Sequence, residues 1–320
     1  MDFLERHQVG FYLGSVAVGL LLGLTVPTFA TGLEALINPA IAVMLWSTFL
    51  AIPMVRVVQA LRDIKFLGLL LGLNFLVVPA VVWLLTRPLT DHPALLLGVV
   101  LVLLVPCVDW VIVFTGLAGG DSARMTAATP VLMVAQMLVL APLVVLIGGP
   151  ELVVDVAPGP FITALLVLLV LPLLLAAGVQ SWATRSAAAA RIQRVGQGAM
   201  VPSLMVVLVL VVASQIAGVG SRWVEVIWTV PVFVAFVVTM TALATLSTRV
   251  FRTTTSPARA IVFSCVARNS LVVLPLALAL PEQFDLVPLV VLTQTVVELA
   301  AMVLLLRVVP ALVPERGIAE

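Results

Sequence analysis

Long apolar runs separated by short polar segments occupy nearly the whole chain, and this pattern predicts a bundle of membrane-spanning helices. A helix that crosses a bilayer needs roughly 20 mostly apolar residues. Ten runs are near this length, with between 16 and 28 residues each: Phe11–Phe29, Leu36–Val55, Phe66–Leu85, Ala94–Ala118, Ala123–Ile147, Phe161–Trp182, Val201–Ile216, Val224–Phe251, Ala258–Leu280 and Leu286–Pro310. The composition agrees, because 63% of the residues are hydrophobic and 10% are charged, whereas soluble domains carry about 25% charged residues.

The charges between the runs predict how the helices are oriented. If the N-terminus is cytoplasmic, the outer side holds two basic residues, Arg87 and Arg222. The inner side then holds thirteen: Arg6, Arg56, Arg62, Lys65, Arg124, Arg185, Arg191, Arg194, Arg249, Arg252, Arg259, Arg307 and Arg316. Cytoplasmic loops of membrane proteins carry such an excess. We therefore expect a multi-pass protein of the cell (inner) membrane with both termini cytoplasmic.

The chain divides into two halves of five helices each near a stretch of glycine and proline around residue 150. An odd number of helices per half gives residues 1–150 and 151–320 opposite orientations, as in transporters built from inverted repeats. The fifth and tenth runs share a proline-to-glutamine spacing of six residues, Pro130–Gln136 and Pro288–Gln294. We expect two inverted five-helix repeats within one membrane domain.

Two of the runs carry a charge near their middle together with signals that interrupt a helix. Pro106 precedes Asp109 in the fourth run, and Arg268 precedes Pro275 in the ninth. Proline removes a backbone donor and breaks or kinks a helix, and irregular backbone at this depth needs a cavity or protein around it. We expect two interrupted helices that cross near the midplane, with Asp109 close to Arg268, either around a bound solute or as a structural ion pair.

The substrate-binding candidates are the polar and sulfur-containing residues of these two interruptions: Cys107, Asp109, Arg268, Asn269 and Ser270. The arginine, amide and hydroxyl groups favour an anion or a hydroxylated solute. Cys107 is either a small apolar packing residue or a soft ligand for a thiophilic solute.

Other intramembrane polar residues are candidates for proton coupling or for a cavity wall. Besides Asp109, these are Glu298, Gln294, Gln136 and Asn74. Gln294 lies four residues before Glu298, which puts both on one helix face, as a proton relay or as a packing hydrogen bond. Asn74 either lines a cavity or joins neighbouring helices by hydrogen bonds.

At these positions the chain resembles the bile acid:sodium symporter superfamily, and within it the arsenite-efflux permeases and arsenic resistance proteins. The segments that carry the resemblance are Leu36–Leu45, Asn74–Pro79, Pro106–Asp121 and Ala267–Ala279. The resemblance implies ten transmembrane helices in two inverted five-helix repeats, an all-α integral membrane fold with helices 4 and 9 broken and crossing.

The resemblance also implies roles for individual residues. The arsenite permeases have a cysteine in a context similar to that of Cys107, which implies that this thiol meets arsenite. Their glutamate three residues after the helix-nine asparagine is absent here, since that position is Val272. In the sodium-coupled branch a glutamate and a glutamine stand where this chain has Ser264 and Arg268, so we expect sodium coupling to be lost and a proton to replace it.

The sequence therefore predicts a secondary transporter, in first place a proton-coupled exporter of As(III) species with antimonite as a related solute. The alternative is a carrier of an organic anion of the bile-acid or carboxylate type. We expect no enzyme activity, no metal site and no cofactor, because no ligand cluster or nucleophile–base arrangement is present. The net charge of +1 provides no basic patch for nucleic acid.

Overall fold

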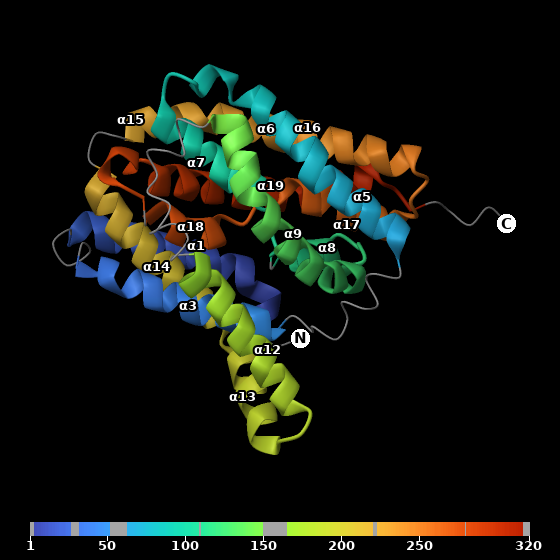
Figure 1. Cartoon of the computed structure of the whole chain (residues 1–320), viewed down its shortest axis with the longest axis horizontal. Coiled ribbons are helices and arrows are strands. Elements are labelled where there is room, and N and C mark those ends of the chain that lie inside the picture. Colours follow the sequence, from blue (N-terminus) through green and yellow to red (C-terminus); the bar gives the residue numbers. More distant parts are fainter. Residues whose placement is uncertain are drawn as a thin grey trace. The chain divides into compact units, whose positions relative to one another are not determined.

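The computed structural model describes residues 3–26, 32–51, 63–108, 110–149, 165–219, 223–278 and 280–315 of the chain (Figure 1). Within these ranges the ordered elements are helices, and the only β-type pairing is one isolated bridge. The all-helical fold class is therefore confirmed.

Each of the ten apolar runs corresponds to helical structure in the described residues. The first half contains α1 (Phe3–Thr25), α3 (Glu34–Ala51), a continuous rod of α5 (Ile64–Gly72), η2 (Leu73–Val77) and α6 (Val78–Leu85), then η3 (Arg87–Leu89), α7 (Pro93–Leu104), α8 (Trp110–Leu117) and α9 (Ser122–Gly148). The second half contains η4 (Leu165–Val170), α12 (Leu171–Ala183), α13 (Ala187–Gly198), α14 (Met200–Val219), α15 (Trp223–Val226), η5 (Ile227–Thr229), α16 (Val230–Val250), α17 (Thr255–Val266), α18 (Ser270–Leu278), η6 (Glu282–Phe284) and α19 (Val287–Leu312).

Four helical segments of the described chain are long and apolar enough to cross a membrane by themselves: Ile64–Leu85, Ser122–Gly148, Val224–Val250 and Val287–Leu312. A fifth span arises if Ala187–Gly198 and Met200–Ser214, which are bent by 45°, count as one. The protein is therefore a multi-pass membrane protein. The ten-helix inverted repeat stays a prediction.

The chain folds into two compact units. The first contains Met1–Ile52, Pro158–Glu225 and Leu274–Leu280, and the second contains Pro53–Ala157, Val226–Val273 and Pro281–Glu320. Each unit combines segments from both halves of the sequence, so the units are not the repeats predicted at residues 1–150 and 151–320, and that division stays a prediction.

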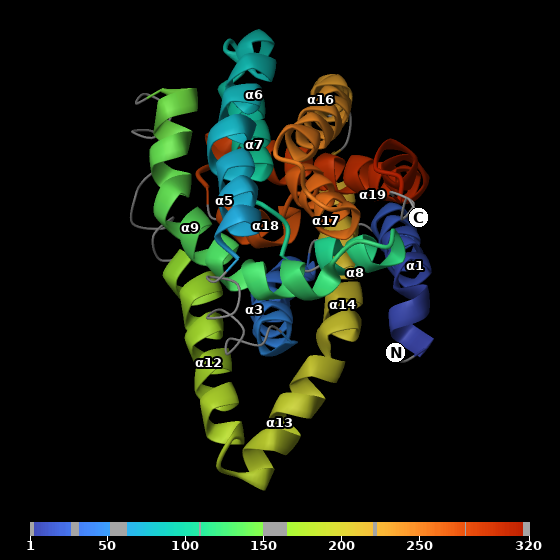
Figure 2. The ribbon, with the colours of Figure 1, turned by 90° about the vertical axis from the view of Figure 1, so that its right-hand side faces the viewer.

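In the first unit, α12 and α13 form a helical hairpin (Figures 1 and 2). Two glutamines of this unit bind the end of α3, since Gln180 donates to the Phe49 carbonyl at 2.9 Å and Gln197 to the Leu50 carbonyl at 2.8 Å. Helix α13 was not among the predicted apolar runs, because its sequence combines alanine with arginine and glutamine on a short surface helix.

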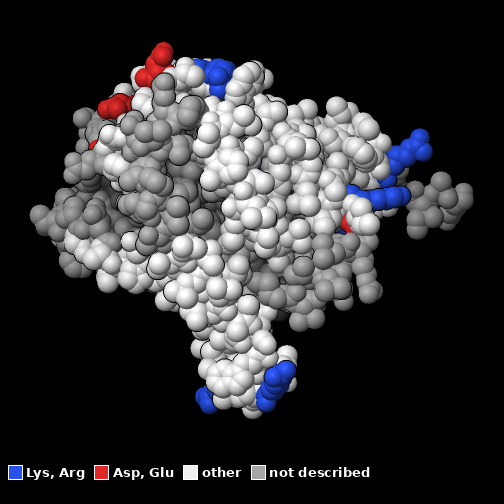
Figure 3. Space-filling view, in the orientation of Figure 1, with Lys and Arg blue, Asp and Glu red and all other residues white. Residues whose placement is uncertain are grey.

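In the second unit, the beginnings of α5, α9 and α17 lie at the same end as the C-terminal ends of α16 and α19. Hydrogen bonds and ion pairs connect these termini: Arg124 pairs with Asp63 at 3.3 Å, Asp121 N donates to Ser256 O at 3.0 Å, and Arg249 donates to Leu312 O at 2.8 Å. Figure 3 shows Lys and Arg side chains gathered where α5 begins and α16 ends.

Five basic residues of the second unit belong to this end, hereafter the basic end: Lys65, Arg124, Arg249, Arg252 and Arg259. Arg87 lies at the other end, where its guanidinium donates to the carbonyl of Ile147 at the end of α9. Most described basic residues of this unit thus lie at one end, where Asp63 and Asp121 pair with Arg124. The orientation of the basic end toward the cytosol stays a prediction.

Candidate functional site

Two helices of the second unit are interrupted at the places where the sequence predicts it. Helix α7 ends at Leu104 and helix α17 at Val266, and the next residue is extended in both cases, with φ −97° and ψ 109° at Val105 and φ −67° and ψ 129° at Ala267. Pro106 explains the first break, because it cannot donate to the preceding turn of a helix.

The two interruptions pair with each other through their backbones. Pro106 and Arg268 face one another in an antiparallel bridge. Cys107 N donates to Ala267 O at 3.1 Å, and Asn269 N donates to Val105 O at 2.8 Å. Polar backbone groups in a membrane need partners inside the protein, and each broken helix supplies partners for the other.

The bridge sets a register between the two breaks. Each helix ends two residues before its bridged residue, so Pro106 corresponds to Arg268 and Cys107 to Asn269. Asp109 itself lies outside the described residues, so the predicted pair of Asp109 with Arg268 stays a prediction.

Arg268 is 2% exposed and is among the largest fully buried side chains of the described structure. Its Nη2 donates to Asn74 Oδ1 at 2.9 Å and to Ser264 O at 2.6 Å, and its Nη1 donates to Leu103 O at 3.3 Å. The guanidinium carbon also lies 5.5 Å from the centre of the Phe236 ring. A charge at this depth requires partners, and here oxygens from α7, η2 and α17 provide them.

Asn74 connects two helices. Its Nδ2 donates to Leu70 O at 3.0 Å and to Ser264 Oγ at 3.3 Å, while its Oδ1 accepts from Arg268. It lies in a π-helical turn, Leu73–Val77, that ends two residues before Pro79. A π turn is a common response where a helix must accommodate a local break in its hydrogen bonds. Asn74 thus joins helices, as one of its two predicted roles requires.

Ser264 contributes to this site although sequence analysis considered it only as a lost sodium ligand. Both its carbonyl and its hydroxyl participate, and the residue is fully buried. Its one signal in the sequence was its position four residues before Arg268, which places the two on the same helix face.

Asn269 and Ser270 begin the helix that follows the second break. Asn269 Oδ1 accepts from Val272 N at 3.1 Å, which caps the start of α18. Its Nδ2 is buried and has no hydrogen-bond partner among the described residues. Ser270, the first residue of α18, is 5% exposed.

Glu298 links α19 to the same interruption. Its Oε2 accepts hydrogen bonds from Arg268 N at 3.2 Å and from Gln294 Nε2. Gln294 and Glu298 therefore lie on the same face of α19, as predicted, and they form a hydrogen bond with each other. Gln294 Oε1 is buried and has no hydrogen-bond partner within the described part of the chain.

Cys107 is 2% exposed and lies next to the bridged Pro106. The charge of Arg268 interacts with Cys107, Cys265 and Glu298, so both thiols lie near the guanidinium. Gln136 on α9 is also buried, but within the described part of the chain no hydrogen bond joins it to this cluster.

Taken together, the crossing places a buried cation, a carboxyl group and a thiol around two paired backbone breaks. Two donors, Arg268 Nε and Asn269 Nδ2, are buried without hydrogen-bond partners among the described residues. Such donors suit a small solute that carries oxygen acceptors. An isolated buried donor is costly, so these groups mark the crossing as the candidate solute site.

Comparison with protein families gives a match over more than half of the chain. The model of the Sodium Bile acid symporter family matches residues 38–221. The matched region includes Asn74, Cys107 and Gln136, whereas Arg268 and Glu298 follow it. No curated protein matches the chain.

Proposed function

We propose that this chain, which belongs to the Sodium Bile acid symporter family, exports As(III) species in exchange for protons. Membership of this family makes the protein a membrane transporter rather than an enzyme. The solute would bind where the α7–α8 and α17–α18 interruptions pair. Antimonite, which has related chemistry, is expected to be a second solute.

The observation that carries this proposal is the position of Cys107. Its thiol belongs to the interruption itself, one residue from the Pro106–Arg268 bridge. Sulfur is a soft ligand that selects soft metal centres, and the Cys107 thiol is buried at the crossing near the Arg268 cation. The free donors of Arg268 and Asn269 would hold the oxygens of the bound metalloid.

Proton coupling is supported by the contacts of Glu298. When ionised, its carboxylate accepts from Arg268 N and from Gln294 Nε2. A proton on this carboxyl group would remove its charge and weaken both bonds. Protonation of Glu298 would therefore loosen the tie between α19 and the second interruption, and Asp109 is a second candidate for the same role.

Independence from sodium is supported by the contacts of Arg268. Its guanidinium already occupies the oxygens of Asn74 and of the Ser264 carbonyl. A sodium ion would have to compete for these oxygens with a fixed positive charge at close range.

The composition of the two compact units supports the inverted repeat. The first unit takes the first two apolar runs of each half, and the second unit takes most of the other three. A division that treats both halves alike is expected if each half is one copy of a five-helix repeat. Ten helices with both ends at the cytoplasmic side of the cell (inner) membrane complete the proposal.

A specific observation also favours a second candidate, transport of an organic anion. The unpartnered donors Arg268 Nε and Asn269 Nδ2 would suit a carboxylate as well as a metalloid oxygen. In that case Cys107 would only fill space.

The test is transport in proteoliposomes that contain purified protein, with an imposed pH gradient and with sodium or choline as the main cation. Arsenite movement should require the pH gradient, should be equal in sodium and choline, and should fall at least tenfold in Cys107→Ala and Cys107→Ser. Cys265→Ala is the matched control, because Cys265 is also a buried thiol near Arg268 but belongs to regular helix.

Transport that persists in both Cys107 variants would contradict the metalloid assignment. If carboxylates such as keto acids or bile acids then move, the second candidate holds. A requirement for sodium would refute the coupling proposed for Arg268.

A further inference from the structure

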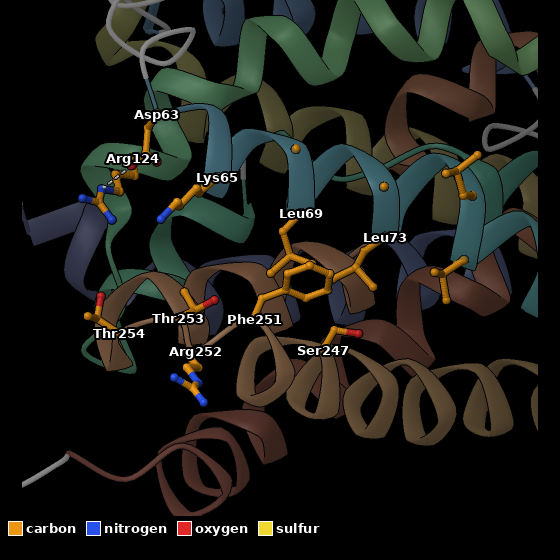
Figure 4. A pocket seen from close by; sticks show the side chains of 14 residues that line it. Asp63, Lys65, Leu69, Leu73, Arg124, Ser247, Phe251, Arg252, Thr253 and Thr254 are labelled. Atoms are coloured by element: carbon orange, nitrogen blue, oxygen red, sulfur yellow. Dashed lines mark ion pairs between the residues drawn. The ribbon is translucent and has the colours of Figure 1, made fainter.

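A groove of about 900 Å³ lies in the second unit between α5–η2 and the end of α16 (Figure 4). It is separate from the crossing, because Asn74 points from η2 toward Arg268 whereas the groove is lined by other positions of the same rod. Figure 4 shows Phe251 extending from the end of α16 toward Leu69 and Leu73, and Lys65 pointing into the mouth of the groove.

The mouth of the groove is positively charged. Lys65, Arg124 and Arg252 line it, together with Asp63 and the hydroxyls of Thr253 and Thr254. Arg124 is compensated, since its Nε lies 3.3 Å from both Asp63 Oδ2 and Asp121 Oδ2. Within the described part of the chain no ion pair compensates Lys65 or Arg252, and both are exposed. These two cations and the two threonine hydroxyls belong to the lining of one groove, a composition that suits an anion such as a phosphate group.

Beyond the mouth, the groove becomes apolar and follows the helix inward. Leu69, Leu73, Leu76 and Val77 line this part. From Lys65 to Val77 the helix rises by about 18 Å, and half of a bilayer's hydrocarbon core is about 15 Å thick. With Lys65 at a membrane surface, a groove of this length would extend to about the depth of one leaflet.

Two glycines create the space along this face. Gly68 and Gly72 line the groove four residues apart, and a Cβ added at either position would meet no heavy atom within 4 Å. Leu76, one further helical turn along, is 73% exposed, so the apolar part is open to surrounding lipid. These features suit a ligand with a flexible apolar chain, which would lie along the groove, and an anionic head group, which would lie at the mouth.

We propose that this groove binds an anionic phospholipid from the bilayer leaflet at the basic end. Its phosphate lies against Lys65 and Arg252, and one acyl chain runs along Gly68, Gly72 and Leu76. The proposal does not depend on the identity of the transported solute.

Native mass spectrometry of the detergent-purified protein with equal amounts of phosphatidylglycerol and phosphatidylcholine tests this site. The wild type should retain phosphatidylglycerol preferentially. Each basic residue near a membrane surface contributes about fivefold in affinity for anionic lipid, so Lys65→Ala with Arg252→Ala should lower the preference by about 25-fold. The matched control is Arg185→Ala with Arg191→Ala, which removes two exposed cations from the first unit.

Gly72→Leu tests the apolar part independently of charge. A Cβ at this position would meet no heavy atom within 4 Å, so the larger side chain should occupy the groove and reduce binding of both lipids to a similar extent. Elution at the wild-type position in size-exclusion chromatography confirms that each variant is folded. Soluble glycerol phosphate, added as a competitor of the lipid, distinguishes a lipid site from a site for free phosphate.

Equal losses in the control pair would mean that diffuse surface charge is responsible and would overturn the proposal. Unchanged binding in Gly72→Leu, or glycerol phosphate that displaces the lipid at similar concentrations, would overturn it as well. Phosphatidylglycerol preference that is lost in the Lys65/Arg252 variant alone, with weaker binding of both lipids in Gly72→Leu, supports it.

Discussion

Replacement of Asn74 by leucine should destabilise the second unit strongly, because Asn74 is the one side chain that accepts a hydrogen bond from the Arg268 guanidinium among the described residues. A hydrogen bond to a charged group contributes about 1.5–3 kcal/mol, and a neutral one about 0.5–1.5 kcal/mol. Loss of the bond to Arg268 and of the longer bond to Ser264 Oγ therefore costs about 2–4 kcal/mol. Asn74→Asp keeps an acceptor for the guanidinium but cannot donate to Leu70 O and Ser264 Oγ, so it should recover only part of the stability lost in Asn74→Leu.

A double-mutant cycle isolates the contact itself. Asn74→Leu and Arg268→Met each leave a buried polar group without its partner, whereas the double variant removes both. The double variant should therefore be more stable than the sum of the single losses predicts, by about 1.5–3 kcal/mol. Reversible denaturant unfolding in detergent micelles measures these free energies. A loss below about 1 kcal/mol in Asn74→Leu, together with an additive cycle, would refute the proposed role of the contact.

Two further predictions concern helix packing and proton coupling. Gly98→Ala should destabilise the fold by about 1–3 kcal/mol, because the added Cβ would lie 2.8 Å from Val290 Cβ. Val290→Gly removes that Cβ, so it should cost less in the Gly98→Ala background than in the wild type. The control is Gly72→Ala, whose added Cβ would meet no heavy atom within 4 Å. Its free energy of unfolding should rise by about 0.5–1 kcal/mol, because alanine is favoured over glycine within a helix. If Gly72→Ala instead lost as much stability as Gly98→Ala in the same unfolding assay, the packing argument would be contradicted. Glu298→Gln keeps an oxygen that can accept from Arg268 N but removes the titrating proton, so solute transport in proteoliposomes should continue without following the pH gradient. Transport that still follows the gradient would exclude Glu298 as the coupling acid.

The interruptions were predictable from sequence because their causes are local. Pro106 cannot complete a helical turn, and a lone Arg268 in an apolar run demands a special surrounding. The contact between Gln294 and Glu298 follows equally from their spacing of four residues. These features depend on neighbours within one helix, which a single sequence displays directly.

The partners of Arg268 were not predictable in the same way. Asn74 lies 194 residues away, and the sequence left open whether it lines a cavity or joins helices. The Ser264 and Leu103 carbonyls are backbone groups, so no residue type could have marked them. Helix α13 was missed because it is short and polar, and an apolar-run analysis is sensitive only to segments that cross the membrane.

The register of the crossing also depended on geometry. The sequence predicted Asp109 close to Arg268 but did not identify which residue faces Arg268 in the backbone pairing, and the antiparallel bridge shows that it is Pro106. Loops between a break and the next helix can differ in length without disturbing the pairing, so distances along the chain are a poor guide to positions across it.

The bridge between the two broken helices consists of main-chain groups alone, donated and accepted by Val105, Cys107, Ala267 and Asn269. Nearly any side chain could occupy these positions without loss of those bonds. The crossing is therefore a framework on which evolution can exchange the groups that contact the solute while the scaffold persists. Divergence in what is carried, within one architecture, is the expected history of such a design.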